Sequence, residues 1–487
     1  MRLSTRLALS SVGLSLALVA GLAGAGTAVA AKPPNIVFVL TDDLSWNLVQ
    51  YLPQVQKLQA EGMTFNDYVV TDSLCCPSRS SIFTGRFPHD TGVFTNGGDD
   101  GGFGYFHGHG EESATFATAL QAKGYRTAMM GKYLNGYQPA DHQGGPQPYV
   151  PPGWSEWDVA GNGYPEFGYN LNENHKIVPY GDAPEDYLTD VIARKGADFI
   201  TRSAQANTPF LLELATFAPH APYTPAPRDA DAFPGLTAPR GPAFDTLPAN
   251  APPWLVSRTP LTATEKQNID TAFRKRAQAV QAVDDLIATV RSAVAKAGVA
   301  GDTYIVFSSD NGYHMGQYRL NPGKMTAFDT DIRVPLIVSG PGVAAKSTSD
   351  AAVANIDLAP TFQHLGDAPI SDTVDGHSLV PLLHGGSGWR TANLVEHHGP
   401  DTQADDPDLP APNSGNPPSY EAMRTNTFTY VEYVDGSREY YDLVRDPHEL
   451  NNIAGTLGPD RLSQLHTGLS KLINCHSGPA CWAAGHF

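Results

Sequence analysis

The chain has 487 residues, of which 41% are hydrophobic and 17% are charged, and its formal net charge is −18 at pH 7. This length exceeds the usual size of one hydrophobic core, so we expect one large domain and a smaller one. The negative charge disfavours nucleic acid and anionic membranes as partners, and no basic tail or stripe offsets it.

Residues 1–30 have the layout of a secretory signal peptide. Two arginines precede an apolar run, and small residues lead to an A-x-A-like cleavage site at Ala28 and Ala30. The alternative is an uncleaved anchor helix, which the glycines near its end disfavour. No later run is long and apolar enough to span a bilayer. We therefore expect an acidic protein that is secreted or otherwise extracytoplasmic, and not a membrane protein after cleavage.

Short apolar runs predict strands, and longer stretches with helical periodicity separate them. The predicted strands are residues 35–40, 210–214, 303–307 and 334–338, and the predicted helices are residues 113–123, 186–204 and 264–297. This alternation predicts an α/β fold in which helices flank a large, mainly parallel sheet, over residues 31–371. Further strands at 427–433 and 439–442 and a helix at 459–473 predict a smaller C-terminal α+β domain over residues 372–487.

Polar clusters follow two of the predicted strands directly. Asp42 and Asp43 come after strand 35–40, and Asp310 and Asn311 come after strand 303–307. Ligands in open α/β sheets collect at the carboxyl ends of the strands. Oxygen donors of this kind suit calcium or magnesium rather than zinc. The alternative is that these residues are ordinary helix caps and turns.

Four long segments are rich in proline, glycine and aromatic residues, namely residues 96–110, 138–181, 218–260 and 399–420. Loops of this length in a compact domain are often binding loops or lids, although they can also be plain surface loops. We expect at least two of the four to form the rim of an active site.

The four cysteines form two pairs. Cys475 and Cys481 close the short loop CHSGPAC, which in an oxidising compartment predicts a disulfide. Cys75 and Cys76 are adjacent, and Cys76 is predicted to be a small buried residue. Because there is no C-x-x-C pair, a thiolate zinc site is not expected.

Residues 74–86 read LCCPSRSSIFTGR, which places C-x-P-S-R, beginning at Cys75, just before T-G-R. A Cys-Pro turn at a helix start would explain the pentapeptide alone. The spacing nevertheless resembles the signature of the sulfatase family. Other segments follow in the order of that family, namely 35–43, 131–135 (GKYLN), 219–222 (PHAP), 309–317 (SDNGYHMGQ), 324–335 and the Y-D-L, D-P and N-N pieces of 441–452. GKYLN and SDNGYHMGQ are most similar to the N-acetylglucosamine-6-sulfatase branch.

The resemblance implies a hydrolase of sulfate monoesters in which a modifying enzyme oxidises Cys75 to formylglycine. The hydrate of that aldehyde would be the nucleophile, and Arg79 would orient it and stabilise its ionised form. One calcium ion, or magnesium, would be held by the ligand set of Asp42, Asp43, Cys75, Asp310 and Asn311.

A sulfate ester also needs positive groups around its oxygens and a proton for the leaving oxygen. By resemblance, Lys132 and Lys324 would bind the sulfate. His220 would bind or protonate the leaving group, with His314 as a second candidate for that proton. Many sulfatases have a histidine two residues after the lysine, where this chain has Leu134. The role of that histidine would fall to Asn135, to His314 or to water.

We therefore expect a secreted sulfatase that acts on a sulfated sugar, such as 6-O-sulfated glucosamine. The strong negative charge favours a terminal sugar or a small ester over the interior of a polyanion. Three alternatives stay open: an arylsulfatase, a phosphonate or phosphodiester hydrolase on the same scaffold, and a carbohydrate-binding homologue with unmodified Cys75.

Overall fold

The computed structural model describes residues 1, 32–403, 406 and 408–487. Apart from Met1, the predicted signal peptide lies outside the described residues. Residues 33–487 group into a single unit, and the predicted boundary between residues 371 and 372 stays a prediction. Within the described part of the chain, no helix combines the length and the apolarity needed to cross a membrane.

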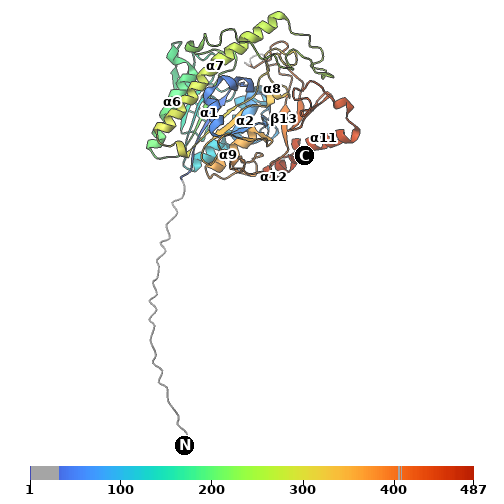
Figure 1. The fold of residues 1–487 in the computed structure, drawn as a ribbon. Coiled ribbons are helices and arrows are strands. Elements are labelled where there is room, and N and C mark those ends of the chain that lie inside the picture. Colours follow the sequence, from blue (N-terminus) through green and yellow to red (C-terminus); the bar gives the residue numbers. More distant parts are fainter. Residues whose placement is uncertain (2–31, 404–405, 407) are drawn as a thin grey trace. The chain divides into compact units, whose positions relative to one another are not determined.

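A large sheet runs through this unit (Figure 1). In the described residues it contains, in spatial order, β11 (Ser347–Ser349), β2 (Met63–Phe65), β10 (Leu336–Ser339), β9 (Thr303–Ser309), β1 (Asn35–Thr41), β8 (Phe210–Ala215), β4 (Arg126–Lys132), β5 (Glu156–Ala160), β6 (Asn170–Glu173) and β7 (Lys176–Pro179). The central strands from β9 to β5 are parallel, whereas β10 and β6 pair with them in the antiparallel direction. The predicted α/β fold is confirmed, with a sheet that is parallel at its centre and mixed towards its edges.

Strand β1 lies in the middle of the core because both of its faces are apolar. Every residue of NIVFVLT is buried. Ile36, Phe38 and Leu40 pack into one hydrophobic cluster, and Val37 and Val39 pack into another on the opposite face. A strand that is buried on both sides is typical of a parallel sheet with helices on each face.

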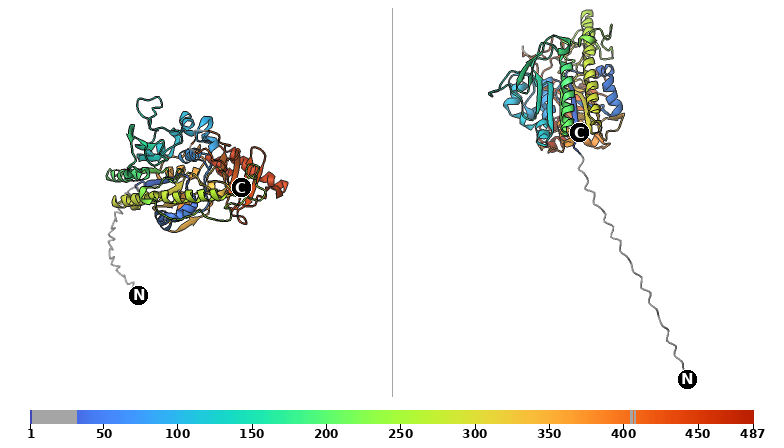
Figure 2. Two further views of the ribbon diagram at one scale, coloured as in Figure 1. Left: turned by 90° about the horizontal axis from the view of Figure 1, so that it is seen from above. Right: turned by 90° about the vertical axis from the view of Figure 1, so that its left-hand side faces the viewer.

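Helices cover both faces of the sheet, on one side α1 (Pro53–Glu61), α6 (Leu188–Gln205) and α7 (Ala263–Lys296), and on the other α2 (Cys75–Thr84), α5 (Phe116–Ala122) and α9 (Leu358–Leu365). Figure 2 shows α6 and α7 side by side along one face. Helix α7 begins at a capping box in which Thr262 and Glu265 bind each other's backbone N–H groups. The shorter helices are α3 (Pro88–Thr91), α4 (Gly102–Gly108), α8 (Asp329–Ile332) and α10 (Val380–Leu383).

The C-terminal part adds a separate antiparallel sheet, in the order β13 (Ala392–His397), β14 (Tyr420–Thr425), β15 (Phe428–Tyr433) and β16 (Arg438–Asp442). Two helices follow it, α11 (Pro459–Ile473) and α12 (Gly478–Ala484). The predicted disulfide between Cys475 and Cys481 is present and joins the end of α11 to α12. A further two-stranded pair, β3 (Tyr68–Val69) with β12 (Val353–Ala354), lies outside both larger sheets.

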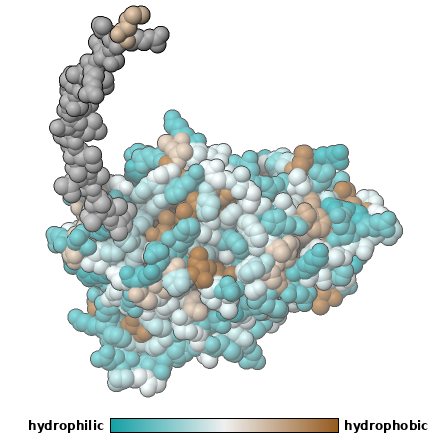
Figure 3. Space-filling model, turned by 90° about the horizontal axis from the view of Figure 1, so that it is seen from below, coloured by the Kyte–Doolittle hydropathy of each residue, from teal (hydrophilic) through white to brown (hydrophobic). Residues whose placement is uncertain are grey.

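The surface agrees with the polar composition of the chain. On the face shown in Figure 3, hydrophobic side chains lie in small groups among hydrophilic ones. Single exposed apolar residues of this kind are ordinary on a folded protein and indicate no interface by themselves.

The buried Glu213 should make the stability of the protein depend on pH. It lies in β8 between β1 and β4, is fully buried, and neither carboxylate oxygen has a hydrogen-bond partner. Burial raises its pKa from 4.5 to about 8, against a smaller opposing effect of Arg79. The folded chain therefore keeps a proton that the unfolded chain releases, so the free energy of unfolding falls as the pH rises from about 4.5 to about 8, by up to about 1.4 kcal/mol per pH unit.

Glu213→Gln should remove this dependence, because glutamine is neutral at every pH. We expect urea unfolding to show that the variant gains stability relative to the wild type between pH 5 and pH 8. If the difference in free energy of unfolding between the two proteins stayed constant from pH 5 to pH 8, Glu213 would not be protonated in the folded chain.

Candidate active site

The acidic residues predicted at two strand ends lie together. Strands β1 and β9 are parallel neighbours, and Thr41 is in register with Ser309, so the residues that follow them come out side by side. The backbone N–H of Asp43 donates to Asp310 Oδ1 at 3.2 Å, and Asn311 Nδ2 donates to Asp43 Oδ1 at 2.7 Å. The side chains concerned are buried. The topology of the sheet thus concentrates negative charge at one point.

The backbone of Asp43 is held in an unusual conformation. Its φ is 63°, in the left-handed region that residues other than glycine adopt at some cost. Arg276, from α7, donates a hydrogen bond to the carbonyl oxygen of Asp43. The guanidinium of Arg276 is buried and lies 4.3 Å from the centre of the Tyr313 ring. We infer that this contact from α7 stabilises the turn that aims the Asp43 carboxylate.

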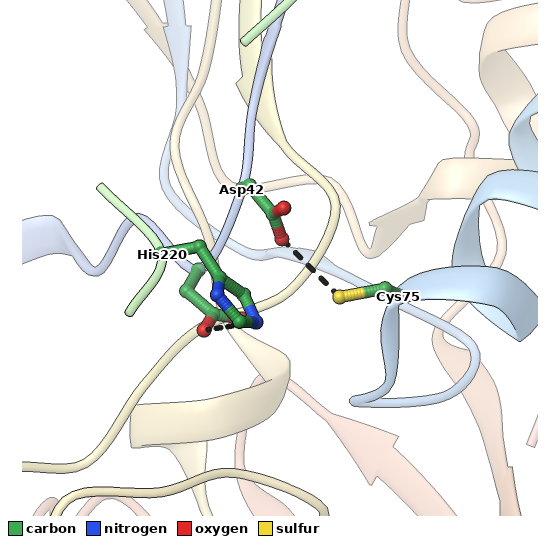
Figure 4. A group of neighbouring side chains, drawn as sticks. Asp42, Cys75 and His220 are labelled. Atoms are coloured by element: carbon green, nitrogen blue, oxygen red, sulfur yellow. Dashed lines mark hydrogen bonds and ion pairs between the residues drawn. The ribbon is translucent and has the colours of Figure 1, made fainter. Parts of the chain in front are cut away.

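Cys75 is the first residue of α2, and its side chain points towards Asp42, with His220 close by (Figure 4). Its Sγ lies 3.2 Å from Asp42 Oδ1 and 2.9 Å from Lys324 Nζ. Burial, followed by the charges of Asp408 and Asp42, raises the pKa of the thiol well above its ordinary value. The unmodified side chain is therefore a poor thiolate nucleophile. Cys76 is buried as well, as predicted.

Three basic side chains neutralise the acids. Lys132, at the end of β4, donates to Asp42 Oδ2 at 2.5 Å, and Lys324 donates to Asp43 Oδ1 at 2.8 Å. Burial disfavours both ammonium groups, but the neighbouring carboxylates outweigh it and raise both pKa values. Arg79 donates through Nε to Asp310 Oδ2 at 2.8 Å. All three cations are therefore charged inside the protein.

His220 contacts the same group of charges. Its Nδ1 is 2.7 Å from the carbonyl oxygen of Ala221, and its Nε2 bonds to Asp408 and lies 3.7 Å from Asp43 Oδ2. Since both ring nitrogens face acceptors, the geometry fits the protonated ring. Burial lowers the pKa of His220, but Asp408 and then Asp43 outweigh it and raise the value to about 8. His220 can thus supply a proton at neutral pH.

Asp408 is the residue that the sequence reasoning missed. Its carboxylate accepts hydrogen bonds from His220 and from Asn96 at 2.7 Å, and it forms an ion pair with Lys324 at 2.8 Å. Motif reasoning had no means of finding it, because no recognised pattern surrounds it. The loop composition was the available signal, since each of the four long loops brings a residue to the site: Asn96, Tyr164, His220 and Asp408.

Two other predicted residues take different positions. Asn135 lies in the group, with its Nδ2 3.3 Å from the Tyr164 hydroxyl and its Oδ1 buried without a partner. The ring nitrogens of His314 are both occupied, Nδ1 by Asp331 at 2.9 Å and Nε2 by the carbonyl oxygen of Ser414 at 2.9 Å. His314 therefore lies beside the site and supports the loop that carries Ser414.

The acid cluster has the donors that a hard cation needs. Ligand atoms of Asp42, Asp43, Cys75 and His220 all lie within 4.8 Å of one another, and Asp310 adjoins this set through Asp43. Asn311 Oδ1 is buried without a hydrogen-bond partner, although buried carbonyl oxygens normally have one. An oxygen-rich set with an unsatisfied amide oxygen fits calcium or magnesium.

A pocket of about 420 Å³ opens onto this group. Its lining includes the charged groups of Asp43, His220, Lys324 and Asp408, together with Tyr223 and Tyr313, whose hydroxyls are 2.8 Å apart. A cavity of this size with charged groups at one end can hold a small polar ligand. A larger hollow of about 540 Å³ lies beside Trp389 and Phe428 and contains none of these site residues.

The comparisons with known proteins agree with this arrangement. A family model described as sulfatase matches residues 34–368. The chain belongs to the sulfatase family. This sulfatase is therefore a sulfuric ester hydrolase, as the resemblance predicted. A second model, described as the C-terminal part of N-sulphoglucosamine sulphohydrolase, matches residues 320–474.

Several relatives resemble the sulfatase over most of its length. An N-acetylglucosamine-6-sulfatase from Homo sapiens is 36% identical over 507 residues, which cover 98% of this chain and 91% of the relative. An extracellular sulfatase SULF-1 homologue from Drosophila melanogaster is 35% identical over 380 residues, which cover 76% of this chain and 33% of that protein. A solved structure described as a complex with its substrate D-glucosamine-2-N,6-O-disulfate has a TM-score of 0.74 and 22% identity, and covers 90% of this chain and 97% of its own.

The buried ion pair of Arg79 with Asp310 should contribute strongly to stability. Arg79→Met removes the cation that pairs with the buried Asp310 carboxylate, and we expect the free energy of unfolding to fall by about 3–5 kcal/mol. Arg79→Lys keeps the charge but loses the forked set of N–H donors. Its free energy of unfolding should therefore lie between those of the wild type and Arg79→Met.

Urea unfolding measures both variants. Arg291→Met is the matched control, because Arg291 pairs with the half-exposed Glu61 at 2.7 Å. Its loss should lower the free energy of unfolding by less than about 1 kcal/mol. A loss in Arg79→Met no larger than in this control would contradict the role of Arg79.

Proposed function

We propose that this sulfatase is a secreted enzyme that removes the 6-O-sulfate of a glucosamine sugar, using a formylglycine made from Cys75 and one calcium ion. The observation that carries the proposal is the surroundings of Cys75. Its side chain begins a buried helix and points into a set of acids and cations that has no evident structural purpose for a plain thiol.

The nucleophile fits these surroundings. The hydrate of formylglycine would supply two hydroxyl groups on one carbon, so that one can attack sulfur and the other can later expel sulfate. Asp42 and Lys324, which contact Sγ at 3.2 and 2.9 Å, are positioned to accept from and donate to such hydroxyls. Arg79 is four residues after Cys75 on α2 and therefore lies on the same face of the helix, where it can orient the modified side chain.

The cations and His220 fit a sulfate ester. Lys132 and Lys324 would bind the sulfate oxygens, because both ammonium groups are buried and act on Cys75 where charge–charge interactions are strong. His220 would give a proton to the leaving oxygen, and we assign that step to it rather than to His314 because both nitrogens of His314 are occupied within the fold. Asn135 and Asp408 would bind the sugar beside them.

A cation held by Asp42, Asp43, Asp310, Asn311 and the modified Cys75 would lower the pKa of a nearby hydroxyl group and offset the charge of the transferring sulfate. Within the protein, these acids are held in place by Lys132, Lys324 and Arg79. We propose calcium because the donors are oxygens and the set is larger than magnesium usually takes from a protein.

The substrate class rests on the relatives. The human relative is named an N-acetylglucosamine-6-sulfatase and aligns with nearly all of this chain. A pocket of about 420 Å³ suits a terminal sugar. Secretion rests on residues 1–30, and activity would require a formylglycine-generating or equivalent enzyme as a partner.

The experiment is a substrate panel on protein co-expressed with a formylglycine-generating enzyme. We expect N-acetylglucosamine 6-sulfate to have the highest kcat/KM, above 4-nitrophenyl sulfate and a phosphonate monoester. Cys75→Ala should lower activity by a factor of at least about 10³, because it removes the nucleophile. Cys76→Ala is the matched control and should stay active.

Mass spectrometry across residue 75 completes the panel. Preference for the aryl sulfate or for the phosphonate would replace the proposed substrate with one of those classes. An unmodified thiol in protein from the native host, together with sugar binding and no turnover, would favour a carbohydrate-binding protein instead.

Stabilisation by calcium tests Asn311 as a metal ligand. Asn311→Ala removes the unsatisfied amide oxygen, so we expect calcium to raise the thermal unfolding midpoint of the wild type at concentrations at least about tenfold lower than those needed for the variant. Unfolding followed by fluorescence measures this without activity. Equal calcium dependence in the two proteins would remove Asn311 from the ligand set.

A further inference from the structure

A second group of metal-binding side chains lies outside the active site. Among the described residues, two groups bring three or more ligand atoms of His, Cys, Asp or Glu within 4.8 Å of one another, and the active site is one of them. The other consists of His89 and Asp90, from α3, and His476, from the loop between α11 and α12. We propose that these three side chains form a zinc site that ties the C-terminal disulfide loop to α3.

The spacing of the ligand atoms suits a small cation. His89 Nε2 lies 3.6 Å from Asp90 Oδ2, and His476 Nδ1 lies 2.7 Å from Asp90 Oδ1. A tetrahedral ion with bonds of about 2.0–2.2 Å places its ligand atoms about 3.4 Å apart. The two observed separations of 2.7 and 3.6 Å lie on either side of this spacing. Two imidazoles and a carboxylate are a donor set that zinc prefers over calcium or magnesium.

His89 is already oriented as a metal-bound histidine would be. Its Nδ1 donates to the Glu396 carboxylate, with both oxygens at 2.9 Å, and Glu396 is buried. Metal-bound histidines usually give their other nitrogen to a carboxylate in this way, which fixes the ring and increases its basicity. Nε2 lies 3.6 Å from Asp90 Oδ2. Its present partner is the carbonyl oxygen of Cys475 at 2.7 Å, and binding of zinc would release the proton that Nε2 donates there.

Asp90 provides an independent indication of a ligand. Its Oδ2 is buried and has no hydrogen-bond partner, while its Oδ1 is occupied by His476. A buried carboxylate oxygen without a partner is costly unless a cation completes it. Asp375 also lies near and accepts a hydrogen bond from the N–H of Phe87 at 2.9 Å. Asp90 thus offers a cation one carboxylate oxygen that the fold leaves without a hydrogen bond.

His476 lets the ion enter and connects the site to the chain's end. Its side chain is 63% exposed, whereas those of His89 and Asp90 are 10% and 13% exposed. It lies between Cys475 and Cys481, inside the disulfide loop. Zinc bound here would join that loop to α3, in addition to the hydrogen bonds, ion pair and ring contact that now connect them.

Zinc binding to the full chain, purified without a polyhistidine tag, tests the proposal. Titration calorimetry with zinc chloride, in excess calcium to occupy the active site, should show one zinc ion per chain. His476→Gln should weaken that binding by at least about tenfold, because it removes one of three ligands. His466→Gln is the matched control, since His466 is 61% exposed and pairs with Glu432 at 2.9 Å, and it should bind zinc like the wild type.

A second measurement uses cobalt as a spectroscopic probe. The wild type should show the intense visible absorption of four-coordinate cobalt, and Asp90→Asn should lose it while keeping its far-UV circular dichroism. Absence of zinc binding by the wild type would overturn the proposal. Equal affinity in the wild type and His476→Gln would also overturn it, because the ion would then be bound elsewhere.

Discussion

Mutual neutralisation of buried charges holds the active site together. Its ionised groups are no more than 9% exposed, and they are equal in number, the acids being Asp42, Asp43, Asp310 and Asp408 and the cations Arg79, Lys132, His220 and Lys324. Either set alone would cost several kcal/mol per ion to bury. Parallel pairing of β1 with β9 brings Asp42, Asp43 and Asp310 together, and the cations make their burial possible. The same cations are then in place for an anionic substrate.

This balance also explains why the site draws on so many segments. Strand ends supply the acids, α2 supplies Cys75 and Arg79, and the long loops supply His220 and Asp408. A rigid sheet fixes the first group, while the loops can vary without disturbing the core. The conformation of Asp43 shows the cost of this precision, because a buried arginine from a distant helix is needed to support one turn.

The sequence predicted those parts of the molecule whose patterns are local. Apolar runs located the starts of β1, β8 and β9 and their ends to within two residues, and motif order pointed to Cys75 and its cations. It could not show that β10 runs antiparallel to β9, because an apolar run carries no direction. Asp408 was missed because its role arises only when a loop folds back over residues far away in the chain. His314 matches a motif, yet its neighbours Asp331 and Ser414 occupy it, and only the folded structure shows this.

The burial of Cys75 restricts when a modifying enzyme could reach this residue. The side chain is completely enclosed at the start of α2, beneath loops from four parts of the chain. An enzyme that oxidises this residue cannot reach it once those loops have closed. The proposed conversion of Cys75 would therefore have to take place on a nascent or still unfolded chain, and the time between synthesis and folding would limit how many molecules become competent. Under that proposal, conditions that speed folding would lower the active fraction, while the total amount of correctly folded protein stays the same.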